Sequence, residues 1–112
     1  MENDRTQQEQ EEAIRRYRES INRSVDADER LSNYAYNPDK NATEEERLRE
    51  DRQRCDENEK SARDEYERLN CESQTGLSAD QYRHETIVDK RAEERESARL
   101  EAEKEKEYSY SL

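Results

Sequence analysis

Apolar residues are sparse along this chain, but where they occur they follow the spacing of a helix. In the middle of the chain, Leu48, Cys55, Ala62 and Leu69 are each seven residues apart, and Tyr66 lies on the companion position of the same stripe. A seven-residue repeat places side chains on one face of a helix that packs against another helix. This segment therefore predicts an amphipathic helix with a narrow apolar seam.

Polar residues interrupt the predicted seams. Arg52 and Glu59 occupy companion positions in the central segment. In the N-terminal third, Ser24 and Asp28 interrupt a similar repeat. A polar residue at a seam position costs stability but specifies register and partner. That N-terminal repeat is carried by Ile14, Tyr17, Ile21 and Leu31.

The C-terminal third carries apolar residues only near its start. Ile87 and Val88 follow Tyr82, and beyond them the same face offers only small residues such as Ala98 and Ala102. Good helix formers, mainly Glu, Arg, Lys and Ala, fill the rest of this segment. The pattern predicts a third helix whose second half has little to bury.

Start and stop signals divide the chain into three helices. Capping boxes, in which two side chains satisfy free backbone N–H groups, are expected at Thr6–Glu9, Thr43–Glu46 and Ser78–Gln81. Asn37-Pro38 disfavours helix before the proline, and Gly76 suits a left-handed helix end. The predicted helices lie near residues 6–35, 43–74 and 78–108.

The predicted fold is all-α, with three long helices in an elongated hairpin, three-helix or coiled-coil arrangement and a sparse core. Residues 1–112 form one helical unit with a short tail at 109–112. Because the turn at Gly76-Leu77 is short, the second and third helices are expected to be antiparallel neighbours. This pairing would place Tyr66 near Ile87 or Val88.

Composition weakens the case for a self-sufficient globule. Charged residues make up 47% of the chain, the formal net charge is -11, and Phe is absent. Such a composition is typical of disordered chains, yet the chain has only one Pro and one Gly. We therefore expect helices that depend on association for much of their stability.

The sequence contains no recognisable catalytic or metal constellation. His84 is the one histidine, and with Asp80 it offers two ligands, too few for a site. A calcium-loop spacing between Asp56 and Glu67 has Lys60 and Ser61 where an oxygen ligand and Gly are required. No enzyme activity, cofactor, metal or small-molecule substrate is expected.

The two cysteines indicate a reducing environment. Cys55 and Cys71 lie on one predicted helix, sixteen residues apart, or roughly 24 Å at the helical rise. A disulfide needs Cα atoms within about 7 Å, so they cannot bridge each other there. The N-terminus shows no signal peptide, and no apolar run suits a membrane span. An intracellular location is expected, in the cytoplasm or inside a reducing assembly such as a virion.

Three functional hypotheses remain. The first is a non-enzymatic helical assembly protein that oligomerises or docks on a larger partner through its thin heptad stripes. The second is an acidic mimic of nucleic acid that inhibits a DNA-binding enzyme, although Arg residues interleave the carboxylates throughout. The third is a designed helical protein. Binding to nucleic acid or to a membrane is not expected.

The residues expected to contact a partner are the seam residues and the last aromatic and aliphatic residues of the chain. They are Ile14, Tyr17, Ile21, Leu31, Leu48, Tyr66, Leu69, Leu77, Tyr82, Ile87, Val88, Tyr110 and Leu112.

Overall fold

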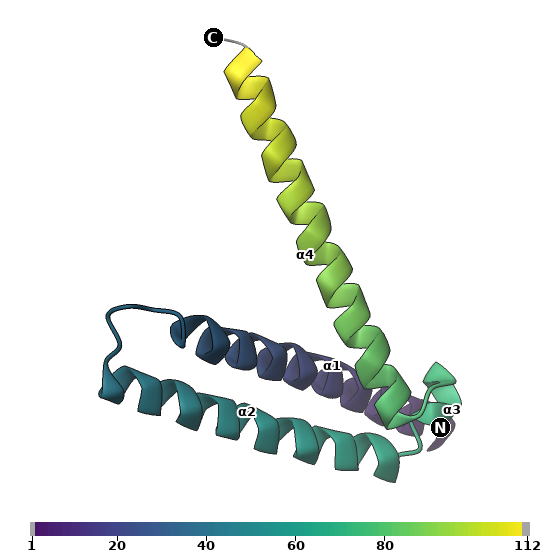
Figure 1. Ribbon diagram of the computed structural model, residues 1–112. Helices are drawn as coiled ribbons and strands as arrows, with labels where there is room; N and C mark the ends of the chain where they lie inside the picture. The colour runs from purple at the N-terminus through teal and green to yellow at the C-terminus, as the bar shows by residue number, and fades with distance from the viewer. Residues whose placement is uncertain (1, 111–112) are drawn as a thin grey trace.

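The computed structural model describes residues 2–110 and the side chains of residues 5–106. Within these limits the chain is all-α and has no strand, as the sequence predicts. Three long helices and one short helix follow in order along the chain (Figure 1). They are α1 (Glu2–Tyr34), α2 (Ala42–Arg68), α3 (Glu72–Thr75) and α4 (Ala79–Tyr110).

Helices α1 and α2 form an antiparallel hairpin, in which they lie side by side along most of their length (Figure 1). Small residues on α1 permit the close approach: Ala13, Ser20 and Ala27 are seven residues apart and are 3%, 7% and 2% exposed. The hydroxyl of Ser24 donates a hydrogen bond to the backbone carbonyl of Cys55 at 3.0 Å. A side chain as short as serine reaches the opposite backbone only where two helices pack closely.

The start of α2 differs from the predicted capping box. Asn41, not Thr43, is the N-cap, and its side chain accepts a hydrogen bond from the Thr43 backbone N–H at 2.9 Å. Asn is as good a cap as Thr, and here it lies one position before the first helical residue. The expected start at Thr6 is also wrong, because α1 begins at Glu2 and continues through that position.

Helix α2 ends earlier than predicted. Its last residue is Arg68, and Asn70 adopts a left-handed backbone with φ of 54°. Asn tolerates this conformation better than most residues, so it can end a helix as glycine does. Gly76 is left-handed as predicted, with φ of 73°, but it closes the separate short helix α3. Gln10 holds this turn on α1, since its Nε2 donates to the Leu69 carbonyl at 2.8 Å.

Helix α4 begins at the predicted capping box. Backbone N–H of Ser78 donates to the Gln81 side chain at 3.0 Å, and backbone N–H of Gln81 donates to the Ser78 hydroxyl at 3.2 Å. The helix then runs through Tyr110, so the tail expected from residue 109 is helical as far as it is described. The last two residues lie outside the described part of the chain.

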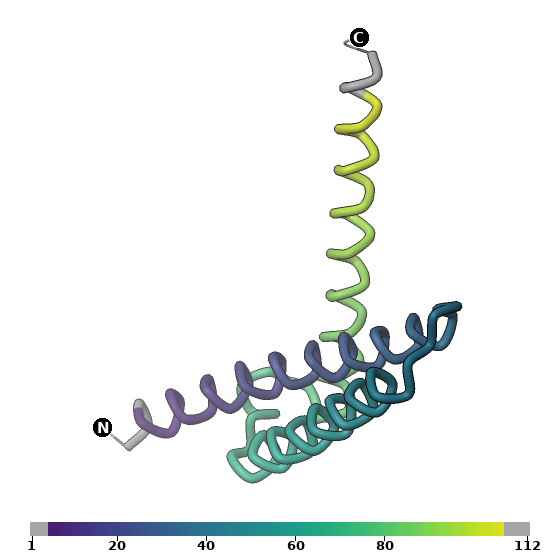
Figure 2. Tube along the Cα trace, turned by 90° about the vertical axis from the view of Figure 1, so that its left-hand side faces the viewer, coloured from purple at the N-terminus to yellow at the C-terminus, as the bar shows by residue number. Residues whose placement is uncertain are grey.

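The expected antiparallel pairing of the second and third long helices is wrong. Helix α4 touches the hairpin through its first turns and then leaves it (Figures 1 and 2). The seam of α2 is already covered by α1, and the second half of α4 has little apolar surface to bury in return. The resulting shape is open, with a radius of gyration of 18.8 Å, against about 13 Å for a compact chain of this length.

The core lies where α1, α2 and the base of α4 meet. Its buried members are few and mostly aromatic or small, as the sparse apolar pattern predicts. They are Ala13, Tyr17, Ile21, Val25, Tyr66, Cys71, Ala79 and Tyr82.

Candidate docking surfaces

Three tyrosine rings join the three long helices at the base of α4. Tyr17 of α1, Tyr66 of α2 and Tyr82 of α4 have ring centroids 5.2 to 5.7 Å apart. Such distances suit tilted and offset aromatic pairs, which stabilise beyond the area that they bury. The cluster therefore fixes where α4 starts relative to the hairpin.

Each tyrosine hydroxyl in this cluster has a polar partner. Tyr17 donates to the backbone carbonyl of Ala79 at 3.0 Å, and Tyr66 donates to that of Leu77 at 2.7 Å. The Tyr82 hydroxyl accepts from Arg18 Nε at 3.1 Å. Burial raises the pKa of Tyr17 from 10.0 to about 12. The Tyr17 phenol is thus a neutral structural group across the physiological range of pH.

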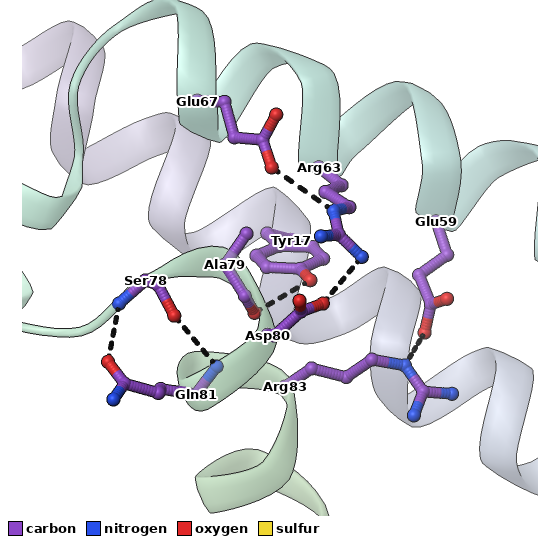
Figure 3. Close-up of polar contacts among 9 residues, drawn as sticks. All are labelled: Tyr17, Glu59, Arg63, Glu67, Ser78, Ala79, Asp80, Gln81 and Arg83. Carbon is purple, nitrogen blue, oxygen red and sulfur yellow. Dashed lines mark hydrogen bonds and ion pairs between the residues drawn. The ribbon is translucent and has the colours of Figure 1, made fainter.

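Charged pairs surround the tyrosines and connect α2 to α4 (Figure 3). Arg63 contacts Asp80 at 2.7 Å, and Arg83 contacts Glu59 at 3.0 Å. Hydrogen bonds to Asp80 and then to Glu67 raise the pKa of the Arg63 guanidinium further above its usual value. The Glu59 side chain is 17% exposed, so this pair is better shielded from solvent than most surface pairs.

The polar seam positions of α1 and α2 also pair with each other. Arg52 Nε lies 3.2 Å from an Asp28 carboxylate oxygen. Both residues interrupt an apolar stripe in the sequence, and the fold sets the two interruptions opposite one another. The register of the hairpin is therefore specified by charge as well as by packing.

A third group of ion pairs holds α4 against α1 just before the helices part. Lys90 Nζ lies 2.8 Å from Asp26 and 3.1 Å from Glu94, and Arg91 contacts Glu29. The Lys90 side chain is only 18% exposed. The carboxylates of Asp26, Glu29 and Glu94 lie within 4.8 Å of one another, and the two cationic side chains bind among them. The group acts as an ionic clamp at the point where α4 departs.

Beyond this clamp α4 projects away from the hairpin (Figures 1 and 2). Every residue from 92 to 106, which we call the arm, is exposed. Leu100 is the one large aliphatic residue of the arm and is 46% exposed. Arg99 contacts Glu96 at 2.6 Å and Glu103 at 3.1 Å along the helix. Pairs of this kind stabilise an isolated helix by about 0.2–0.5 kcal/mol each.

A groove lies between α1 and α2 on the side of the hairpin away from α4. It has a volume of about 410 Å³, and small residues, including Ser20 and Ala62, form its floor. Arg16 and Arg23 line its α1 rim, and Glu65 lines its α2 rim. All the residues that line this hairpin groove belong to α1 and α2. The groove is therefore open to a partner on this side of the hairpin.

The structure divides the predicted contact residues into three groups. Most lie in the core of the chain or against it, and so serve its own folding: Ile14, Tyr17, Ile21, Tyr66, Leu69, Leu77, Tyr82 and Ile87. Leu31 and Leu48 are half-buried near the loop that joins α1 to α2, and Val88 is 44% exposed. The Tyr110 side chain and Leu112 lie outside the described part.

Reasoning from the sequence missed the small residues that shape the hairpin. Ala13, Ser20 and Ala27 carry a seven-residue repeat, but in the N-terminal helix only large apolar residues were taken as seam positions. The repeat itself is the signal that reveals them. Leu100 was missed for the opposite reason, because it lies off the stripe that contains Val88.

The side chains offer little activated chemistry. Burial raises the pKa of the Cys71 thiol, and burial together with Asp51 and Asp56 raises that of Cys55. A raised pKa keeps a thiol protonated, and the thiolate is the nucleophilic form. Both cysteines are free. His84 lies on the exposed surface of α4 and, among the described residues, forms no ligand cluster with either thiol.

In the described part of the chain, no helix is both long enough and apolar enough to cross a membrane. Comparison of the chain with protein-family models, with curated proteins and with solved structures found no match.

Proposed function

We propose that this chain is a non-enzymatic helical assembly protein, and that the arm of α4 is its docking element. The observation that carries the proposal is the arm itself: residues 92–106 are helical and exposed, and they stand away from the hairpin. An isolated helix of this length is marginal in water without packing. A partner that covered the arm would supply the burial that the chain lacks.

The distribution of the core supports this reading. The seams of α1 and α2 face each other and are used within the chain, so the docking role falls to α4 rather than to all three helices. The tyrosine cluster and the ionic clamp hold the base of α4 in a fixed direction. A rigidly based, projecting helix can be bound with a small loss of conformational freedom.

The alternative of a nucleic-acid mimic receives less support. Such a mimic needs carboxylates at phosphate-like spacing with few cations near them. Here Arg and Lys side chains pair with carboxylates both along and between helices, as at Asp28–Arg52 and Asp26–Lys90. The acidic surface is therefore broken by cations.

The test is the native size of the full chain expressed in its own host. The wild-type chain should elute in a complex larger than one chain. Ala98→Pro should move it to the size of a single chain, because proline breaks a helix interior at a cost of about 3 kcal/mol. Ala98 is exposed and distant from the core, so the hairpin should remain folded.

Glu101→Ala is the control for this experiment, since Glu101 is exposed and its replacement alters the arm but keeps its helix. Circular dichroism of the purified variants checks that each still folds. A wild-type chain that elutes alone, or an Ala98→Pro chain that stays in the complex, would contradict the proposal.

A further inference from the structure

We infer that the arm of α4 binds in the hairpin groove of a second copy of the same chain. This inference rests on the proposed function, in which the arm is a docking element, and it names the partner. It begins with two surfaces that one chain exposes and cannot bring together. The α1 residues that line the groove lie on a different face of that helix from Arg18, Asp26 and Glu29, which contact α4.

The first argument is a match of spacing. On the groove rim, Arg16 and Arg23 flank Ser20 at intervals of four and three residues. On the arm, Glu96 and Glu103 flank Leu100 at the same intervals. Residues four and seven apart share one face of a helix. Glu19 also lines the groove, one position before Ser20, and Arg99, which pairs with Glu96 and Glu103, stands one position before Leu100. Each charge on the α1 rim of the groove therefore has a charge of opposite sign at the same spacing on the arm.

The second argument is a match of size. Leu100 is the one large aliphatic side chain of the arm and is 46% exposed. The groove floor opposite it is made of small residues, among them Ala13, Ser20 and Ala62. A large side chain of one helix fits into a hollow formed by small side chains of others. In the proposed contact, Leu100 of one copy therefore inserts, as a knob, between the small residues of the groove floor of another copy.

The second rim of the groove gives a further complementary pair. Glu65 lies on the α2 side, whereas the Lys104 side chain follows Leu100 by one turn of the arm. An arm that sets Glu96 and Glu103 beside α1 can set Lys104 towards α2. The ion pairs that these residues make within their own chain, such as Arg16–Glu12, lie on exposed surface and are weak. They can exchange for contacts with a second copy.

The placement of the two surfaces determines the kind of assembly. The arm leaves the hairpin on the face of α1 that carries Arg18 and Asp26, and the groove opens on another face, which carries Arg16 and Arg23. A contact between two different surfaces repeats from copy to copy, so the assembly grows head to tail. The average mass of the wild-type assemblies should therefore rise steadily from micromolar to millimolar chain concentration, because a small interface binds weakly.

The experiment is a charge exchange followed by sedimentation velocity. One full-length variant carries Arg16→Glu and Arg23→Glu, and the other carries Glu96→Arg and Glu103→Arg. All four positions are exposed, so the hairpin should stay folded in both variants. Because the arm variant loses the pairs of Arg99 with Glu96 and Glu103, circular dichroism checks that its arm is still helical. Each variant alone should remain a single chain at every concentration, because its arm and its groove repel each other. An equimolar mixture should associate as the wild type does, because charges of opposite sign meet again.

Two further variants complete the test. Leu100→Ala should weaken association of the wild-type sequence at least severalfold, since it removes the knob. Glu50→Arg with Glu57→Arg matches the charge change of the arm variant on the outer side of α2 and should leave association unchanged. Wild-type chains that remain single, variants that associate alone, or a mixture that does not associate would each overturn the inference. The elution experiment with Ala98→Pro is independent of these outcomes, because it asks whether the arm docks on any partner and not whether that partner is a second copy.

Discussion

At the scale of single residues, tyrosine fills the core positions that Phe and Leu occupy in other helical proteins. Tyr17 and Tyr66 are 0% and 1% exposed, yet each hydroxyl finds a backbone carbonyl to which it donates. Those carbonyls belong to the turn before α4 and to its first residue. A tyrosine at this junction therefore contributes both buried area and a directional bond. This combination suits a chain that has few apolar residues to bury.

The buried phenol of Tyr17 predicts a loss of stability at alkaline pH. Its pKa is raised from 10.0 to about 12 in the folded chain, so the folded state favours the neutral form. The stabilisation is complete below pH 10 and is lost as pH rises through the folded pKa. By pH 12 the free energy of unfolding should have fallen by roughly 2 kcal/mol from this group.

Urea unfolding followed by circular dichroism from pH 8 to 12 measures this effect. Tyr17→Phe should lower stability at neutral pH by about 1 kcal/mol and should flatten the alkaline decline. Tyr36→Phe is the matched control, because Tyr36 is 88% exposed. An alkaline decline of equal size in the Tyr17→Phe variant would show that another group causes it.

At the scale of helices, the sequence predicts what local signals control. The long helices, the left-handed Gly76 and the capping box of Ser78 and Gln81 all follow from residues close together in the chain. The end of α2 at Arg68 was missed because Asn70 is a weaker stop signal than glycine. Local signals thus predict the existence of each helix more accurately than the residue at which it ends.

Which helices pair could not be read from local signals. The short turn at Gly76 favours α2 and α4 as neighbours, but α1 competes for the same seam. It prevails because Ala13, Ser20 and Ala27 let its backbone approach α2, and because Asp28 meets Arg52 there. The docking surfaces depend on this outcome, since the groove exists only once α1 and α2 are paired.

The small residues of α1 give a prediction at this scale. Ala27 is 2% exposed between the hairpin helices, so Ala27→Leu should force them apart. Overpacking of this kind costs about 1–3 kcal/mol, and thermal unfolding of the variant should show a lower midpoint. Ala102→Leu, on the exposed arm, should change the midpoint little. Equal midpoints for the two variants would mean that close packing at Ala27 does not limit stability.

At the scale of the whole molecule, stability and exposure are unevenly distributed. The core joins the hairpin to the base of α4, and the ionic clamp around Lys90 is the last contact before the arm. The extents of 61 × 43 × 21 Å describe a thin, angular molecule. The hairpin and the base of α4 share a core, whereas the arm is an exposed helix with ion pairs along its surface, such as those of Arg99 with Glu96 and Glu103. The arm lacks a surface to pack against, and a second copy of the chain or another partner would supply it.

This division predicts two classes of backbone amide in hydrogen exchange. Dilute full-length chain, below the concentration at which copies associate, should protect amides of residues 13–25 by close to the free energy of global unfolding. Amides of the arm, 92–106, should exchange far faster, because every one of these residues is exposed and their opening uncovers little buried surface. Raising the concentration should slow exchange in the arm selectively, since binding stabilises only the helical form. Arm amides as protected as the core in dilute solution would show that the helix is stable alone, and that the need for a partner has another cause.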